Sequence, residues 1–223
     1  MDLQQVRANT ARKRSALFRT FIAGMPRPVR VIDIGGTQEM WRRWQFSEAD
    51  GVCVTLVNDH VSDVRLRDEA TLGASFTKWW RDARQLRPGD YADFDVVFSN
   101  STLEHLYTRD NQRLVAGSIV ASGKPFFVQV PNPHSPVDPH FPHPFAAFFG
   151  TWPRHWQAAA LTRHALGSGR KYDTIDAALH RLENYLPVDR PALHELFPDA
   201  RIVTEWTFGL PLSLIAQRAG PNS

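Results

Sequence analysis

The chain has 223 residues, of which 43% are hydrophobic and 22% charged, a composition typical of a globular protein that can bury a full core in one domain. It has no apolar run of about 18 residues, which excludes a predicted transmembrane span. Its first residues lack the apolar stretch of a secretory signal, so we expect a cytoplasmic protein. The single cysteine, Cys53, excludes an internal disulfide and a multi-thiolate metal site.

Positive charge is concentrated at the start of the chain. The first 30 residues carry seven Arg or Lys and one acid, so the other 193 residues carry a net charge of −3 within the total of +3. Such a segment either binds nucleic acid or anionic headgroups, or is the solvated face of a helix. We favour a helix over residues 3–24, ended by Gly24 and Pro26. Its apolar stripe lies opposite most of the basic side chains: Leu17, Phe18, Phe21 and Ile22 against Arg12, Lys13, Arg14 and Arg19.

Apolar strands recur along the first two thirds of the chain. The predicted strands cover residues 29–36, 51–58, 94–100 and 125–130. Their continuous apolar runs are typical of strands buried on both faces of a parallel sheet. The segments ARIVTEWTF and LPLSLIAQR are predicted to close the sheet as an antiparallel pair, because only a short turn joins them.

Between the predicted strands at 94–100 and 125–130, Asp110 is predicted to cap a helix that runs to about Val120. The apolar positions of this helix are Leu114, Ile119 and Val120. We expect Trp79 and Trp80 to pack against the core, and Cys53 to be an inert thiol buried in its strand.

A different pattern occupies residues 131–190. Residues 131–144 hold six prolines and three histidines, which excludes a regular element there. Helical spacing follows at about 153–166 and again at 172–186. The predicted fold is therefore α/β: a doubly wound, mostly parallel sheet with an antiparallel last strand and a helical cap inserted over residues 131–190.

Polar and glycine residues follow the predicted strands at their carboxyl ends, where ligands bind in open α/β sheets. Glycines allow a ligand to approach the backbone closely, and the amide and carboxylate groups suit ribose hydroxyls and an adenine amino group. The set comprises Asp33, Gly35, Gly36 and Thr37 after the first strand, Asn58 and Asp59 after the second, Asp82 and Ala83 before the third, and Asn100 and Ser101 after it.

These segments resemble the motifs of the class I S-adenosylmethionine-dependent methyltransferases, of the type 11/12 kind. VIDIGGT is similar to the family's first motif, DARQL to its adenine-binding segment, and FDVVFSNSTLEHL to its fourth-strand motif. The resemblance covers residues 28–134 well and the closing strands loosely, and it implies a seven-stranded Rossmann-like sheet. It also implies S-adenosylmethionine as cofactor, with the methionine moiety at Asp33, Gly35 and Gly36, the ribose at Asn58 or Asp59, the adenine at Asp82 and Ala83, and the sulfonium beside Asn100 and Ser101.

The sequence departs from the family pattern at two places. Thr37 or Gln38 stands where the third glycine is usual, and Asn58 stands at the ribose acid, with Asp59 one place later. An uncharged Asn58 hydrogen-bonds a hydroxyl less strongly than a carboxylate does. A dinucleotide dehydrogenase is disfavoured, because G-G-T-Q-E-M does not provide the G-x-G-x-x-G pattern.

A general base is one candidate contribution to transfer onto a hydroxyl. His105 follows the third strand, although Glu104 and His105 more often brace the helix there in this family. In the proline-rich loop, Asp138 and His140 are candidates for a base with an orienting carboxylate, and His140 is alternatively substrate-binding or structural. No metal is expected, because one Asp suits magnesium poorly and the spacing of His134, His140 and His143 matches no standard zinc site.

The sequence thus predicts a single methyltransferase domain that transfers a methyl group to a small-molecule or glycan-like acceptor, by O-methylation. Its expected parts are a basic helix at 1–27, a cofactor-binding half at 28–130, an acceptor cap at 131–190 and closing strands at 191–223. An RNA methyltransferase and a non-catalytic binding module are the alternatives. Nucleic acid is not the expected partner, because the charge outside the first 30 residues is negative. The oligomeric state is open.

Overall fold

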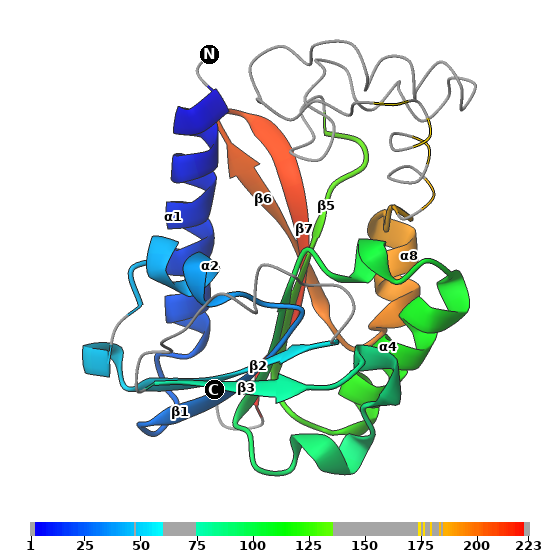
Figure 1. The fold of residues 1–223 in the computed structure, drawn as a ribbon. Helices are drawn as coiled ribbons and strands as arrows, with labels where there is room; N and C mark the ends of the chain where they lie inside the picture. Colours follow the sequence, from blue (N-terminus) through cyan, green and yellow to red (C-terminus); the bar gives the residue numbers. More distant parts are fainter. Residues whose placement is uncertain are drawn as a thin grey trace.

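The protein folds around one seven-stranded sheet. The computed structural model describes residues 3–46, 48–59, 75–135, 174, 176, 179, 183 and 185–220. The strand order is β3-β2-β1-β4-β5-β7-β6 (Figure 1). In chain order the strands are β1 (Val29–Ile34), β2 (Val52–Asn58), β3 (Phe76–Trp80), β4 (Val96–Asn100), β5 (Phe126–Pro131), β6 (Arg201–Thr207) and β7 (Leu210–Arg218). The predicted mostly parallel α/β sheet of seven strands is confirmed.

The five strands β1 to β5 run parallel, and β7 is antiparallel to both of its neighbours. All six residues of β5 are buried, as continuous apolar runs in a central parallel strand require. A tight hairpin joins β6 to β7, with Phe208 at φ 52° and Gly209 at φ 76°, the positive values that suit the twist of a two-residue hairpin. The predicted antiparallel closing pair is thus confirmed.

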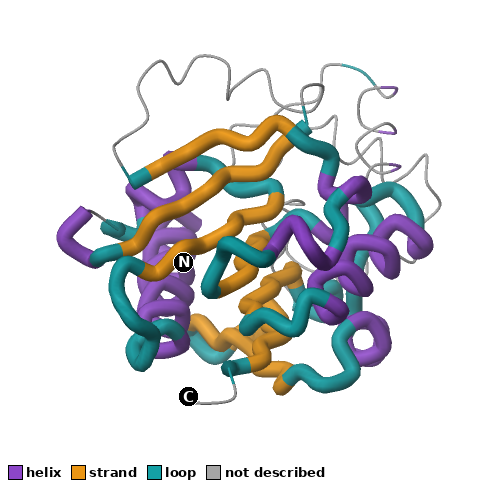
Figure 2. The backbone as a smooth tube through the Cα atoms, turned by 90° about the horizontal axis from the view of Figure 1, so that it is seen from below, coloured by secondary structure: helices purple, strands orange, loops and turns teal. Residues whose placement is uncertain are grey.

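Helices cover both faces of the sheet (Figures 1 and 2). The α-helices are α1 (Leu3–Phe21), α2 (Gln38–Arg43), α4 (Arg109–Ala121) and α8 (Arg190–Leu196), and the short 3-10 helices are η1 (Glu48–Asp50), η2 (Ala83–Gln85), η3 (Pro88–Tyr91) and η4 (Leu103–His105). One face packs against α1 and α2, and the other against α4 and α8. Within the described ranges, no helix combines the length and the apolar character that crossing a membrane requires.

Aromatic side chains hold α1 on the sheet. Phe18 is fully buried, and its ring centroid lies 4.8 Å from that of Phe98, 5.4 Å from Phe127 and 5.6 Å from Trp41. Edge-on aromatic pairs at such distances add to the free energy gained by burial. The basic N-terminal helix α1 is therefore part of the domain and covers one face of the sheet.

Four details of the helices differ from the prediction. Helix α1 ends at Phe21, and Leu17, assigned to its apolar stripe, is 37% exposed. Helix α4 is capped by Thr108, whose hydroxyl accepts from the Asn111 amide, and Asp110 lies inside the first turn. Leu114 is 46% exposed because it faces away from the sheet. The sequence pattern located α1 and α4, but Leu17 and Leu114 were wrongly assigned to their buried faces.

Two details of the strands also differ. Trp79 and Trp80 belong to an edge strand, β3, which the sequence analysis did not assign, since its run FTKWW is only partly buried. Trp79 does pack against the core, as expected. Cys53 is exposed rather than buried, because alternate residues of β2 point away from the α1 face. The predicted helices at 153–166 and most of the predicted 172–186 helix lie outside the described residues.

Candidate functional site

A cavity of about 360 Å³ opens at the carboxyl ends of β1, β2, β3 and β4. This is the edge at which open α/β sheets bind ligands. Seven of the residues predicted for the site line it: Gly35, Asn58, Asp59, Asp82, Ala83, Ser101 and His105. The structure thus brings together residues from four strand ends that are up to 70 positions apart in the sequence.

The turn after β1 has glycines because neighbouring side chains occupy the space of a Cβ. Gly35 has φ +77°, and a Cβ there would lie 2.4 Å from Thr102 Oγ1. A Cβ on Gly36 would lie 1.7 Å from Asp33 Oδ2. Thr102 itself donates to the Ile34 carbonyl at 2.9 Å. Close packing of Thr102, which follows β4, therefore accounts for Gly35, and the buried Asp33 side chain of β1 accounts for Gly36.

Asp33 lies behind this turn and does not line the cavity. Its side chain is fully buried, and Oδ2 accepts a hydrogen bond from Trp41 Nε1 at 2.6 Å. Oδ1 has no hydrogen-bond partner in the part of the chain that the structure describes. Burial raises the pKa of Asp33 to about 7, against the lowering effect of the Trp41 hydrogen bond. Asp33 is thus a partly satisfied acceptor next to the glycine turn.

Thr37, which follows the glycines, has a structural role in the described chain. Its hydroxyl accepts from the Met40 amide at 3.3 Å and caps α2. The residue that replaces the usual third glycine is therefore the start signal of the next helix.

At the end of β2, Asn58 and Asp59 both line the cavity. The Asn58 amide group donates to the Gly36 carbonyl at 3.0 Å, so Nδ2 ties the end of β2 to the glycine turn. Since Nδ2 is used in this way, Oδ1 is the group that Asn58 offers to a hydroxyl donor.

The side chain of Asp82 makes strong contacts within the protein. Its oxygens accept from Arg84 Nε at 2.9 and 2.8 Å, and Oδ1 also accepts from the Arg84 amide at 2.8 Å. Hydrogen bonds from Arg84 hold the pKa of Asp82 below its usual range. Arg84 and Arg81 both line the cavity, and Arg81 is paired with Asp90 at 2.9 Å. Arg84 lies inside the DARQL segment but was not singled out from the sequence as a cavity residue.

At the end of β4, Ser101 and Asn100 are held by residues from other elements. Ser101 has φ 57°, an uncommon conformation for this residue type, and its hydroxyl donates to Gln129 Oε1 at 2.9 Å. Asn100 is half-buried and does not line the cavity. Its Oδ1 accepts from Arg14 Nη1 at 2.7 Å. Arg14 therefore points toward the sheet, and its assignment to the solvated face of the N-terminal helix was wrong.

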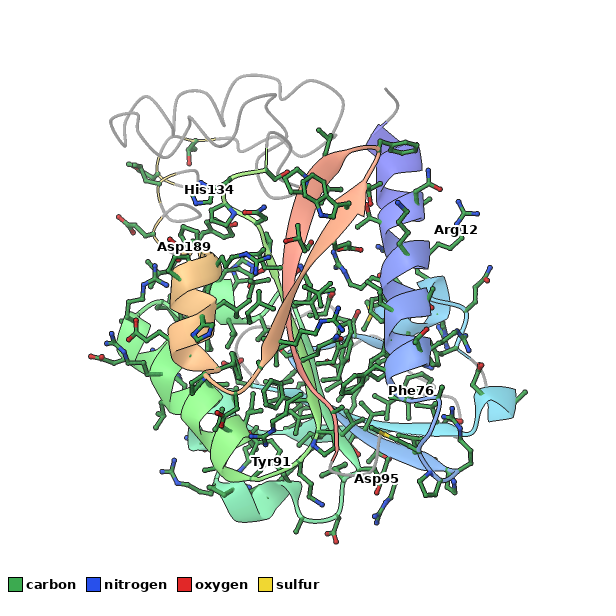
Figure 3. The ribbon with its side chains drawn as sticks, turned by 180° about the vertical axis from the view of Figure 1, so that it is seen from behind. Arg12, Phe76, Tyr91, Asp95, His134 and Asp189 are labelled. Atoms are coloured by element: carbon green, nitrogen blue, oxygen red, sulfur yellow. The ribbon has the colours of Figure 1, made fainter. Side chains whose placement is uncertain are left out.

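His105 is the candidate base that the structure places at the cavity. Its ring centroid lies 5.9 Å from that of Tyr185, while Glu104 next to it is fully buried. His140 and Asp138, the other candidate base and its carboxylate, lie outside the described residues. His134 is exposed on the loop after β5 (Figure 3). Among the described residues, no group of three His, Cys, Asp or Glu side chains is arranged to hold a metal.

Comparison with solved structures defines the fold. A structure described as a SAM-dependent methyltransferase from Anabaena variabilis matches with a TM-score of 0.54 at 10% identity, over 97% of this chain and 94% of the other. Human N-acetylserotonin methyltransferase in complex with SAM matches with a TM-score of 0.53 at 14% identity, over 93% of this chain and 51% of the other. The protein therefore has the class I SAM-dependent methyltransferase fold.

A structure assigned to the Zn-dependent alcohol dehydrogenases of Rhodobacter sphaeroides matches similarly, with a TM-score of 0.53 at 15% identity over 91% of this chain and 88% of the other. The sheet topology distinguishes a methyltransferase fold from a dinucleotide-binding fold. Dinucleotide-binding sheets have the order 3-2-1-4-5-6, whereas here antiparallel β7 lies between β5 and β6.

Several neighbours are described as O-methyltransferases, and this chain spans only 54–59% of their length. No protein-family profile and no curated protein matches the sequence.

Proposed function

We propose that the protein is an S-adenosylmethionine-dependent methyltransferase. The observation that carries this proposal is the cavity itself: in a methyltransferase fold, residues from the ends of β1, β2 and β4 meet around one space with the polar groups that the cofactor needs. Two solved neighbours are described as holding SAM or SAH. The unsatisfied Oδ1 of Asp33 beside the glycine turn fits a ligand that carries an amino group, which would favour the ionised carboxylate.

The proposed cofactor contacts keep the positions that the sequence resemblance implies. Gly35 and Gly36 form the turn against which the methionine part rests, in front of Asp33. Asn58 and Asp59 accept from the ribose hydroxyls, Asp82 and Ala83 border the adenine, and Ser101 flanks the sulfonium. Asn100, also predicted there, does not line the cavity and acts on this end only through its neighbours. An adenine amino group at Asp82 shares that carboxylate with Arg84, whose exposed side chain is able to rotate toward solvent.

The cofactor supplies a methyl group on a sulfonium, which transfers by in-line displacement. The chain aligns the acceptor and excludes water, and alignment alone lowers such a barrier by about 7–11 kcal/mol. For a hydroxyl acceptor, His105 is proposed to remove the proton, because it lines the cavity, with His140 and Asp138 as the other candidates. A general base adds roughly 10²–10⁴ to the rate, so alignment is the larger contribution.

We propose a small-molecule or glycan-like acceptor, methylated on oxygen. Support comes from neighbours described as O-methyltransferases, among them a mitomycin 7-O-methyltransferase. Strand β5 ends at the same edge of the sheet as the cavity, and the segment 131–190, which continues from its end in the sequence, is proposed to determine the acceptor.

An RNA acceptor is disfavoured by the contacts of the basic N-terminal segment. Arg14 is bonded inside the domain, Arg19 is paired with Asp50, and Arg30 is paired with Asp95 at 3.1 Å. Much of the charge that suggested nucleic acid therefore neutralises acids of the protein itself.

The proposal is tested by titrating site variants with S-adenosylhomocysteine in a calorimeter. Asn58→Leu, which has a similar volume but no acceptor, is expected to weaken binding at least fivefold, since a buried hydrogen bond is worth about 1 kcal/mol or more. Asp95→Asn is the matched control, because Asp95 lies at the opposite edge of the sheet (Figure 3). Equal affinity of the two variants for S-adenosylhomocysteine would refute the site. A non-catalytic binding module would bind S-adenosylmethionine and S-adenosylhomocysteine without transferring a methyl group to any acceptor.

A further inference from the structure

A layer of polar side chains lies on the α1 face of the sheet, directly above its aromatic core. Phe98 and Phe127 are neighbours in the register of β4 and β5, and two residues further along the same face are Asn100 and Gln129. Glu205 and Ser213 are neighbours in β6 and β7 on that face. The sheet therefore changes from aromatic to polar toward the edge that carries the cavity.

Arg14 enters this polar layer from α1. It precedes Phe18 by four residues, which places it one turn along the same helix face. Its guanidinium donates to Glu205 Oε2 at 2.6 and 3.1 Å, to Ser213 Oγ at 2.7 Å, to Asn100 Oδ1 at 2.7 Å and to Gln129 Oε1 at 3.2 Å. One side chain thus joins four strands, and only 12% of it is exposed.

This network reaches the proposed methyl-transfer end of the cavity. Gln129 Oε1 accepts from both Arg14 and Ser101, and Ser101 lines the cavity. Because Arg14 holds the oxygen of Asn100, the amide nitrogen of Asn100 faces away from the guanidinium. Arg14 therefore sets the orientation of Asn100 and Ser101 at the end of β4.

The charge of Arg14 poses a physical problem for a cationic ligand. Two hydrogen bonds that share Gln129 Oε1, of 3.2 and 2.9 Å, place Arg14 Nη1 within about 6 Å of Ser101 Oγ on the cavity wall, where a unit charge still acts on another in a protein interior. Glu205, whose side chain is 1% exposed, supplies the compensating negative charge. Its Oε1 is buried and makes no hydrogen bond with any described residue, so its charge is not taken up by other donors.

We propose that Arg14 and Glu205 are positioning residues of the methyl-transfer site: Arg14 orients Asn100 and Ser101, and Glu205 cancels the charge of Arg14 so that a sulfonium binds next to it. This inference rests on the proposed function and assigns a role to two residues outside the motifs. It explains why an ion pair, rather than apolar side chains, occupies this buried layer, since burying a pair stabilises the fold little by itself.

The test compares the affinities of the full chain for S-adenosylmethionine and S-adenosylhomocysteine, which differ by one methyl and one positive charge. Glu205→Gln leaves Arg14 uncompensated and is expected to raise the ratio Kd(SAM)/Kd(SAH) at least about fivefold. Arg14→Met combined with Glu205→Gln leaves no net charge and is expected to return the ratio to within twofold of wild type. Arg12→Met is the matched control, since Arg12 lies on the outer side of the same helix (Figure 3).

A merely structural ion pair would change both affinities together and leave the ratio unchanged, which would overturn the inference. Asn100→Asp provides a second variant of opposite sign, because Arg14 then faces the new carboxylate as well as Glu205 and the layer carries one net negative charge. It is expected to lower the ratio about fivefold, and an unchanged ratio would likewise overturn the inference. Wild-type protein that binds neither ligand would overturn the proposed function together with this inference, whereas binding with an invariant ratio refutes the inference alone.

Discussion

The clearest structural prediction concerns Gly36, the second glycine of the turn after β1. A Cβ at this position would lie 1.7 Å from Asp33 Oδ2 and 2.1 Å from its Cγ. Both atoms belong to a fully buried side chain that accepts from Trp41 Nε1 at 2.6 Å. Gly36→Ala must therefore displace the Asp33 carboxyl group and break that hydrogen bond.

The expected cost of Gly36→Ala is the sum of two effects. A buried hydrogen bond that involves an ionisable group is worth about 1.5–3 kcal/mol, and overpacking of a dense core costs about 1–3 kcal/mol. The free energy of unfolding is thus expected to fall by about 3–5 kcal/mol, measured by urea denaturation with far-ultraviolet circular dichroism.

Two further variants make this test specific. Gly117→Ala is the control, because no described atom lies within 4 Å of the added Cβ, and in the middle of α4 it is expected to stabilise by up to about 1 kcal/mol. In an Asp33→Ala background the obstructing atoms are gone, so Gly36→Ala is expected to cost less than about 1 kcal/mol there. Equal costs of Gly36→Ala in both backgrounds would refute the clash.

Three other predictions concern stability and reactivity. The folded-state pKa of Asp33 is raised to about 7, so between about pH 4 and pH 7 the folded chain binds a proton that the unfolded chain has lost. The free energy of unfolding therefore falls as pH rises through this range, by at most about 4 kcal/mol. Asp33→Asn should flatten this pH dependence, and an unchanged slope in urea titrations would argue against it. Thr108→Ala removes the cap of α4 and should lower the free energy of unfolding by about 1 kcal/mol in the same assay. Asp110→Ala changes a side chain that is 93% exposed and should cost less than about half of that. The reverse order of the two costs would identify Asp110 as the cap. Because Cys53 is exposed, a thiol-reactive chromogenic disulfide should label the native protein without denaturant, and labelling that needs unfolding would contradict its exposure.

The fold was predictable where the sequence pattern is strong. Continuous apolar runs located β1, β2, β4 and β5, and the short connection with Gly209 predicted the antiparallel closing pair. Edge strand β3 was missed because a strand with one partner buries few residues, so FTKWW lacks a clear period.

The site was predictable only in part, for a similar reason. Residues at strand ends, such as Asn58 and Ser101, converge on one cavity because parallel strands end at the same edge. Arg14 was misassigned because a single buried basic side chain does not change the apolar periodicity of a helix, and because Leu17, which was assigned to the buried face, is partly exposed. Its partner Glu205 lies 191 residues away, and such long-range pairs depend on the finished topology.

The central claim is that the cavity at the strand ends binds S-adenosylmethionine, and calorimetric titration of the wild-type chain tests it most directly. The account predicts one site that binds both S-adenosylmethionine and S-adenosylhomocysteine with micromolar affinity. No detectable binding of either ligand at millimolar concentration would contradict it.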